Sequence, residues 1–248
     1  MKAHILALGA HPDDVEIAVG GTLLVSSSQE LTVVIADATT GGMSTNGTVS
    51  EREHEAQHAA RLLGAAERVN VGLPSNQINP ACWEQRLAVA RLVRTYQPEV
   101  ILLPYSAFPG SANPEEVDRH PDHRNVSVLL AESLHLARLA RLDLDGLEPW
   151  LPRAVIRYSI HATLPATGFV VDISAVWARK MEAILAHRSQ FVLDAGRTRT
   201  ALNGGDFLEL CEARARLVGA KIDVEYGEAF FPDRPPAVTN ILQPFGGK

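Results

Sequence analysis

Apolar runs and amphipathic stretches alternate along the first hundred residues of the chain. Each run is short and nearly continuous, a pattern typical of strands that are buried on both faces of a sheet. The runs that we interpret as strands are residues 4–10, 31–37, 68–73 and 99–104. The helices expected between them cover residues 21–29, 50–63 and 81–96. This alternation predicts an α/β fold of the Rossmann-like kind, a mostly parallel sheet with helices on both faces.

The second half of the chain continues with similar elements. We expect a helix from 124 to about 142, strands at 154–160 and 168–174, and helices at 175–190 and 206–218. The tail from residue 232 is too rich in proline for a regular element. A proline-bounded linker lies at 149–152, but nothing marks a clean domain boundary, so we expect a single domain over residues 1–248.

Local signals mark the ends of the helix at 50–63. Ser50 and Glu53 match the capping-box pattern, in which the two side chains bond to backbone groups at the start of a helix. Gly64 is typical of the residue that follows a helix.

The charge balance argues against a nucleic-acid-binding protein. The 23 Lys and Arg are outnumbered by 29 Asp and Glu, for a formal net charge of −6, and they form no basic block that could neutralise phosphates. No apolar stretch reaches the roughly 18 residues that a membrane span needs, and the apolar run after Lys2 is too short for a signal peptide. We therefore expect a cytoplasmic protein with neither nucleic-acid nor membrane partners.

Two acidic histidine clusters, "HPDD" at 11–14 and "HPDH" at 120–123, carry the candidate chemistry. Together they supply three His and three Asp, which are ligands that suit Zn²⁺, and the lack of cysteine is typical of a catalytic metal site. Proline after the first His of each cluster bends the chain, so that residues three positions apart can face one point. Both clusters also follow predicted strands, and we expect them at the same edge of the sheet.

A helix cap is the alternative interpretation of the aspartates, because carboxylates are favoured at helix N-termini. It explains one of Asp13 and Asp14 but not the neighbouring histidines or the repeated tripeptide. Adjacent carboxylates also repel each other unless a cation lies between them. The sequence therefore favours the metal site.

The stretches "AHPDDVEIAVGGT" and "HPDHR" resemble the paired motifs of the LmbE-like, or PIG-L, superfamily of zinc-dependent N-acetylglucosaminide deacetylases. Further stretches, "STNGTVSEREHEAQHAARLLG", "GLPSNQI", "FVVDIS", "KMEAILAHRSQF" and "EARARLVGAKIDVEYGEAF", resemble the bacillithiol-biosynthesis branch over nearly the whole chain. The resemblance implies a zinc-dependent hydrolase that removes acetate from an N-acetylglucosaminyl substrate, with N-acetylglucosaminyl malate as the leading candidate. It also implies a homo-oligomer, with a hexamer as one form.

Roles for individual residues follow from matching positions to the family's motifs. The resemblance implies His11, Asp14 and His123 as metal ligands and Asp13 as the general base that acts on the metal's water. It implies His120, held by Asp122, as the acid or electrostatic partner beside the scissile amide. It implies Arg52 as a substrate-binding residue, although a solvated charge on a helix face is the alternative.

Several features leave the substrate and metal open. Ser75 stands where the branch tends to carry Asp, and the loop at 106–118 is long enough to reshape the entrance of a pocket. Glu16 could orient a ligand from behind or complement a helix N-terminus, and His187 lies among polar residues where a helix ends. Fe²⁺ and Co²⁺ accept ligands similar to those of Zn²⁺.

Other functions fit parts of the same pattern. A deacetylase of chito-oligosaccharides or other N-acyl sugars, or an amidase of thiol conjugates, would keep the site and change the substrate. A catalytically silent metal- or sugar-binding module would require the loss of a ligand or base, which the sequence does not show. A nucleotide-binding protein is disfavoured because the first strand ends in "GAHPDD" and not in G-x-G-x-x-G.

Overall fold

The computed structural model describes residues 1–105, 120–160 and 168–240. Its strands are β1 Ile5–Gly9, β2 Val33–Thr39, β3 Glu67–Leu73, β4 Val100–Pro104, β5 Ala154–Tyr158, β6 Phe169–Asp172 and β7 Gly227–Pro232. Its α-helices are α1 Asp14–Ser28, α2 Val49–Leu63, α3 Trp83–Tyr96, α4 Pro121–Ala137, α5 Trp177–Leu185, α6 Arg188–Phe191 and α7 Phe207–Gly219. Short 3-10 turns lie at Ser174–Val176 and Ala220–Ile222.

The strands of the described chain form one sheet in the order β3-β2-β1-β4-β5-β7-β6. The first five strands in that order pair in parallel, and β7 pairs antiparallel with both β5 and β6. The predicted α/β fold with a mostly parallel sheet is confirmed. The order reverses direction between β1 and β4, and in open α/β sheets ligands bind at the carboxyl ends of the strands beside such a point.

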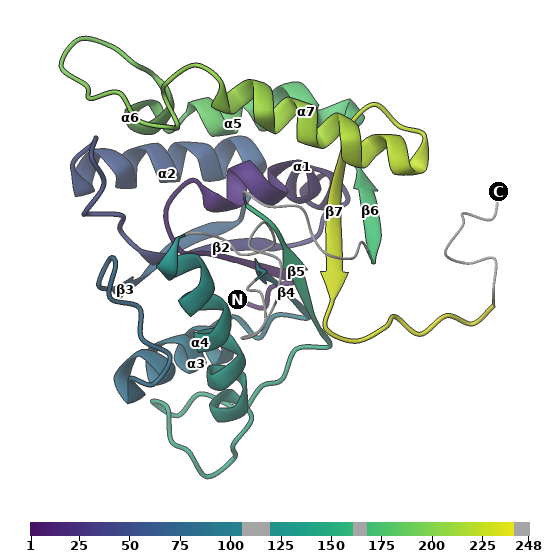
Figure 1. The fold of residues 1–248 in the computed structure, drawn as a ribbon. Helices are drawn as coiled ribbons and strands as arrows, with labels where there is room; N and C mark the ends of the chain where they lie inside the picture. The colour runs from purple at the N-terminus through teal and green to yellow at the C-terminus, as the bar shows by residue number, and fades with distance from the viewer. Residues whose placement is uncertain (106–119, 161–167, 241–248) are drawn as a thin grey trace, which may run out of the picture.

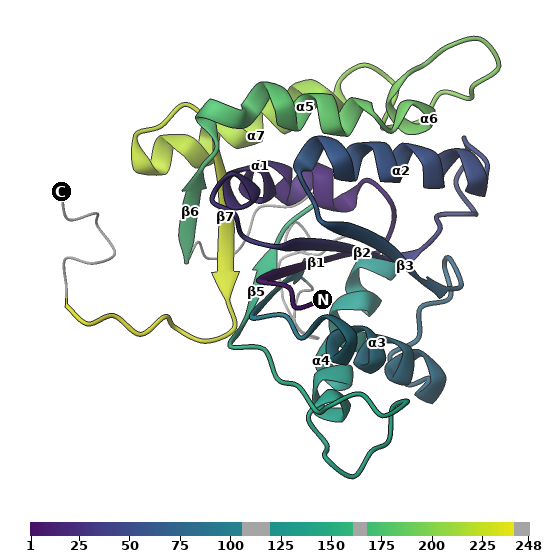
Figure 2. The ribbon, with the colours of Figure 1, turned by 180° about the vertical axis from the view of Figure 1, so that it is seen from behind.

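Helices cover both faces of the sheet, with α1, α2, α5 and α7 on one side and α3 and α4 on the other (Figures 1 and 2). Side chains of β1 alternate between the two layers. Leu6 and Leu8 belong to the core cluster under α3 and α4, whereas Ala7 belongs to the cluster under α1 and α5. The sheet is thus buried on both faces, which is why its central strands are continuous apolar runs in the sequence.

Helix α1 packs closely because two glycines lie in it. A Cβ added to Gly21 would lie 2.7 Å from Cγ2 of Ile173, which is too close, whereas a Cβ at Gly20 would meet its nearest neighbours at 3.5 Å. Only Gly21 is therefore required by the packing.

The ends of two helices differ from those that the sequence predicted. The capping box of α2 is Thr48 with Glu51, two residues earlier than the expected Ser50 with Glu53, because both pairs fit the same pattern and the chain turns at Thr48. Helix α4 begins at Pro121, three residues before the expected start at 124, since proline is well tolerated at the first helical position. It ends at Ala137, before the expected end near 142.

The structure also differs from the sequence prediction at one strand and one helix of the second half of the chain. Strand β7 was not expected, because its short apolar run directly precedes the proline-rich tail. The predicted helix at 175–190 is divided into a 3-10 turn, α5 and α6. The loop at 106–118 lies outside the described residues. Within the described residues, no helix is long and apolar enough to cross a membrane.

Candidate active site

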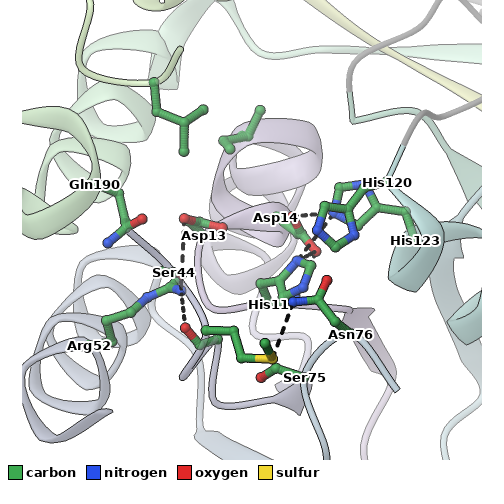
Figure 3. Close-up of a pocket in the computed structure, with 14 residues that line it drawn as sticks. His11, Asp13, Asp14, Ser44, Arg52, Ser75, Asn76, His120, His123 and Gln190 are labelled. Carbon is green, nitrogen blue, oxygen red and sulfur yellow. Dashed lines mark hydrogen bonds and ion pairs between the residues drawn. The ribbon is translucent and has the colours of Figure 1, made fainter. Parts of the chain in front are cut away.

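A pocket of about 190 Å³ opens at the carboxyl edge of the sheet, beside β1 and β2 (Figure 3). Its walls come from the β1–α1 turn and the start of α1, the loops that follow β2 and β3, the starts of α2 and α4, and segments in and near α6. The residues that line it are His11, Asp13, Asp14, Ile17, Gly41, Met43, Ser44, Arg52, Ser75, Asn76, His120, His123, Gln190 and Leu202. All the predicted site residues except Asp122 therefore line one pocket.

The β1–α1 turn holds the first histidine cluster. Asp14 lies in the first turn of α1, where its Oδ2 accepts hydrogen bonds from the backbone N–H groups of Ala10 at 2.8 Å and His11 at 2.9 Å. Asp13 precedes the helix with φ 125°, a conformation that is costly for a residue with a Cβ, and its side chain makes no capping bond. The interpretation of Asp13 as a simple helix cap is thus wrong, and such strain is common at functional sites.

The second cluster is formed by the start of α4. His120 is the residue before the helix, and its Nδ1 accepts a hydrogen bond from the backbone N–H of Asp122 at 3.2 Å. In a neutral ring this bond leaves the proton on Nε2. Such a ring can donate a hydrogen bond from Nε2, which is compatible with the predicted role of His120 as the acid or electrostatic partner beside the scissile amide.

The two clusters converge although more than a hundred residues separate them. His123 Nε2 lies 3.3 Å from His11 Nδ1 and 3.2 Å from Asp14 Oδ1, and His11 Nδ1 lies 3.7 Å from Asp14 Oδ2. One nitrogen from each of His11, His120 and His123 falls within 4.8 Å of the others. These side chains meet on one side of Asp13 (Figure 3).

The Asp122 carboxylate contacts His11 and not the ring of His120, where we expected it. Its Oδ2 lies 3.2 Å from His11 Nε2 and accepts a hydrogen bond from the backbone N–H of Asn76 at 2.7 Å. This contact places the proton of His11 on Nε2 and leaves Nδ1 available inside the cluster, as in carboxylate–histidine–metal arrangements. Sequence spacing could not reveal the contact, because it joins residues 111 positions apart.

These contacts perturb the acid–base properties of the cluster. Burial opposes the charge on His11, yet its bonds to Asp122 and Asp14 raise its pKa to about 9. Burial and the neighbouring histidines lower the pKa of His120 to about 4. Burial disfavours the charged form of Asp14, but the adjacent His123 and His11 hold its pKa well below the usual value. Several shifted groups in one pocket are typical of an active site.

Asp13 is buried beside Arg52. Burial raises the pKa of Asp13 to about 6, and the charge of Arg52 opposes this rise. Arg52 Nη2 lies 3.2 Å from Asp13 Oδ2 and donates to the backbone oxygen of Pro12 at 2.6 Å, while Nη1 donates to Ser44 Oγ and, at 3.0 Å, to the backbone oxygen of Gly41. A carboxylate with a pKa near neutrality suits a general base.

Gly41 makes room for Arg52. Its φ of +64° favours glycine, and a Cβ at this position would lie 1.9 Å from Arg52 Nη1. Arg52 itself is buried, so the alternative of a solvated charge on a helix face is wrong.

Glu16, whose role the sequence left open, lies behind the pocket in a buried ionic cluster. Arg68 binds it through Nη1 and also pairs with both carboxylate oxygens of Asp37 at 2.8 and 2.9 Å. His187 Nε2 lies 3.2 Å from Glu16 Oε1. Burial disfavours the charged form of Glu16, but Arg68 and His187 lower the pKa of Glu16 to about 2. Through Arg68 and His187, Glu16 thus links α1 to β2, β3 and the turn between α5 and α6, and it contacts none of the candidate metal ligands.

The residues present fit a divalent metal ion. Imidazole nitrogens of His11 and His123 and the carboxylate of Asp14 face one another, a nitrogen and oxygen donor set that suits Zn²⁺ or Fe²⁺. The other carboxylate oxygen of Asp122, Oδ1, is buried and accepts no hydrogen bond among the described residues. Such a buried anion is stabilised by nearby positive charge, which a cation beside His11 would supply.

Sequence reasoning missed part of the pocket wall. Ser44, Asn76, Gln190 and Leu202 line the pocket, and none of them stands in a motif whose spacing predicts chemistry. Ser44, Asn76 and Gln190 do stand in the stretches "STNGTVSEREHEAQHAARLLG", "GLPSNQI" and "KMEAILAHRSQF" that resemble the family, but the resemblance assigned them no role.

One protein family matches the part of the chain that carries both histidine clusters. The family described as PIG-L: GlcNAc-PI de-N-acetylase matches residues 6–134, which include both histidine clusters. A diacetylchitobiose deacetylase from Thermococcus kodakarensis is 29% identical over 77% of this chain and 71% of its own length. A probable N-acetyl-α-D-glucosaminyl L-malate deacetylase 2 from Bacillus anthracis is 23% identical over 77% of this chain and 82% of its own.

Solved structures agree with the fold over almost the whole chain. A conserved protein from Thermus thermophilus has a TM-score of 0.82 and 34% identity, with 96% of this chain and 98% of the other covered. The N,N'-diacetylchitobiose deacetylase from Pyrococcus horikoshii has a TM-score of 0.77 and 28% identity, with 94% of this chain and 84% of the other covered. The resemblance is thus confirmed for the superfamily, while the bacillithiol branch is more distant than the diacetylchitobiose deacetylases.

Proposed function

The chain belongs to the PIG-L family of GlcNAc-PI de-N-acetylases, and on that basis we propose that it hydrolyses the acetamido group of an N-acetylglucosaminyl sugar. The observation that carries the proposal is the meeting of His11, Asp14 and His123 beside the buried Asp13. A short chito-oligosaccharide such as N,N'-diacetylchitobiose is the first candidate substrate, because relatives with that activity are the more similar ones. N-acetylglucosaminyl malate is the second.

In the proposed reaction, His11, Asp14 and His123 hold a divalent metal, with Zn²⁺ as the first candidate. Such an ion supplies Lewis acidity, which polarises a carbonyl and makes a water molecule more acidic. Asp122 orients His11 through Nε2, which would leave Nδ1 as the nitrogen that holds the ion.

The remaining steps belong to the protein's own side chains. Asp13 takes a proton from the attacking water as oxygen bonds to the acetyl carbon. His120, through Nε2–H, stabilises the negative charge that develops on the carbonyl oxygen. The carbon–nitrogen bond then breaks, the proton passes to the departing amine, and the products are acetate and the free amino sugar.

We propose two roles for Arg52. The first is to contact the substrate at the pocket wall, and the second is to hold Asp13 in place. Its bonds to Asp13, Pro12 and Gly41 support the second role, because they fix the guanidinium on the base. The small pocket volume supports binding of a single sugar ring, since pockets for larger ligands run to about 300–1,000 Å³.

Turnover by the purified protein tests this proposal. Acetate release is measured with N,N'-diacetylchitobiose, N-acetylglucosaminyl malate and free N-acetylglucosamine, while the bound metal is quantified. We expect the highest kcat/KM with N,N'-diacetylchitobiose. Preference for the malate glycoside would instead favour the second candidate, and a protein that binds metal but releases no acetate from any of the three would contradict the proposal.

A further inference from the structure

Gln190, in α6, is anchored through its amide nitrogen. Nε2 donates hydrogen bonds to the backbone oxygen of Asn46 at 2.8 Å and to Ser189 Oγ at 2.9 Å. A side-chain amide has two hydrogens, so both are used by the protein. These two acceptors decide which way the amide faces, because an amide turned the other way would set its oxygen against the oxygen of Asn46.

The groups that anchor Gln190 are themselves held. Ser189 donates from both its backbone N–H and its hydroxyl to the Glu55 carboxylate, each at 2.6 Å. Asn46 exchanges two hydrogen bonds with the backbone of Thr198, at 2.7 and 2.9 Å. The amide plane of Gln190 is therefore set by three separate segments of the chain before any ligand arrives.

The amide oxygen of Gln190 remains as an acceptor at the pocket wall. Figure 3 shows Oε1 on the side of the amide that faces Asp13, with the nitrogen turned away. Within the described residues, Oε1 accepts no hydrogen bond from the protein. A fixed, uncharged acceptor at a pocket wall favours a ligand group that donates a hydrogen bond and disfavours an anion.

The position of Gln190 indicates which part of the ligand it meets. Gln190 and the three histidines lie on opposite sides of Asp13 (Figure 3). When the acetamido group of a substrate lies at the histidines, its sugar ring extends past Asp13 toward Gln190. The group that reaches Gln190 therefore belongs to the sugar ring. The hydrogen-bond donors on such a ring are hydroxyl groups.

We propose that Gln190 determines specificity by accepting a hydrogen bond from one free hydroxyl of the sugar ring. This inference rests on the proposed deacetylation of an N-acetylglucosaminyl sugar. The selected substrates are those in which that hydroxyl is unsubstituted, because an ether, ester or anion at the position would leave Oε1 without a donor.

Two variants and a set of sugar analogues test the role. Gln190→Leu and Gln190→Met remove the acceptor together with the two hydrogen bonds that Nε2 donates. Gln57→Leu makes the same chemical change on α2 outside this pocket, where Gln57 Nε2 donates to the backbone oxygen of Arg68. Kinetics are measured with N,N'-diacetylchitobiose and with analogues that each lack one hydroxyl of the ring that carries the scissile acetamido group. Thermal unfolding shows whether each variant keeps the fold, and Gln190→Met serves if Gln190→Leu does not.

We expect both Gln190 variants to lose about tenfold in kcat/KM, mainly through a higher KM, as for one lost hydrogen bond. With the wild type, one of the deoxy analogues should show the same loss in kcat/KM relative to N,N'-diacetylchitobiose. With the Gln190 variants, that analogue should show no loss beyond the one that the substitution itself causes. Gln57→Leu should match the wild type.

Wild-type kinetics in both Gln190 variants, or equal losses for every analogue in wild type and variant, would overturn the role of Gln190 and leave the proposed function standing. If the wild type released no acetate from any N-acetylglucosaminyl sugar, both the proposed function and the sugar contact would be overturned.

Discussion

Arg52 Nη2 lies 3.2 Å from Asp13 Oδ2, and the two side chains expose only 2% and 7% of their surface. A buried guanidinium and a buried carboxylate in contact stabilise each other's charge, and removal of either leaves the other unpaired. The sequence predicted Arg52 as a substrate-binding residue. Its contact with Asp13 adds a second role, which kinetic constants can separate from the first.

Replacement of Arg52 by lysine separates the two roles. Lysine keeps the charge but lacks the planar set of donors that reaches Gly41, Pro12 and Asp13 together. We expect kcat to fall roughly tenfold or more, because Asp13 is no longer held in place. Steady-state kinetics provide the measurement, and a rise in KM with unchanged kcat would assign Arg52 to substrate contact alone.

Replacement of Asp13 by asparagine tests the general base. Asparagine tolerates the φ of 125° about as well as aspartate does, so the turn should persist, but its amide cannot accept a proton. We expect a loss of about 10²–10⁴-fold in kcat with the metal content unchanged. Activity near that of the wild type would remove Asp13 from the mechanism.

Removal of the metal tests the ligand set. We expect chelation to abolish acetate release and Zn²⁺ to restore it, with Fe²⁺ as a second metal to compare. His123→Ala should bind little metal, whereas Asp122→Asn should weaken metal affinity by about 10–100-fold, because only the orientation of His11 is lost. Activity that is indifferent to the chelator would contradict a metal-dependent reaction.

Replacement of Arg68 by methionine tests the buried ionic cluster behind the pocket. The variant leaves Glu16 and Asp37 as buried carboxylates without their shared partner. We expect the free energy of unfolding to fall by about 3–5 kcal/mol, as measured by denaturant titration. A matched change at Arg153, an exposed residue paired with Glu99, should cost less than about 1 kcal/mol. Similar losses in the two variants would show that the buried cluster contributes no more to the free energy of unfolding than an exposed ion pair does.

The adjacent glycines of α1 form a matched pair. Gly21→Ala would place a Cβ 2.7 Å from Ile173, and we expect a loss of about 1–3 kcal/mol in the free energy of unfolding. Gly20→Ala meets only ordinary contacts at 3.5 Å and should be neutral or stabilise the helix by about 0.5–1 kcal/mol. Equal effects at the two positions would show that Ile173 moves aside.

A homo-oligomer, including the hexamer that the resemblance implies, remains a prediction. Light scattering of the purified protein at several concentrations measures the mass in solution. A mass equal to that of one 26.8 kDa chain at all concentrations would contradict it.

Much of the fold was predictable from local pattern. Continuous apolar runs identified β1, β2 and β4 because a strand that is buried on both faces is mostly apolar. Strand β7 escaped because its antiparallel position at one side of the sheet depends on pairing with β5 and β6, which are distant in sequence. The start of α4 was misplaced because the proline that opens the helix also belongs to the "HPDH" cluster.

By itself the sequence determined which residue types could hold a metal, since His, Asp and their three-residue spacing are local properties of "HPDD" and "HPDH". Only the tertiary structure decided their partners. Asp122 contacts His11, Arg52 contacts Asp13, and Gln190 turns its amide oxygen toward the pocket. The physical reason is that each side-chain orientation depends on hydrogen bonds to groups brought close by the packing of helices on the sheet, and sequence spacing carries no record of those distances.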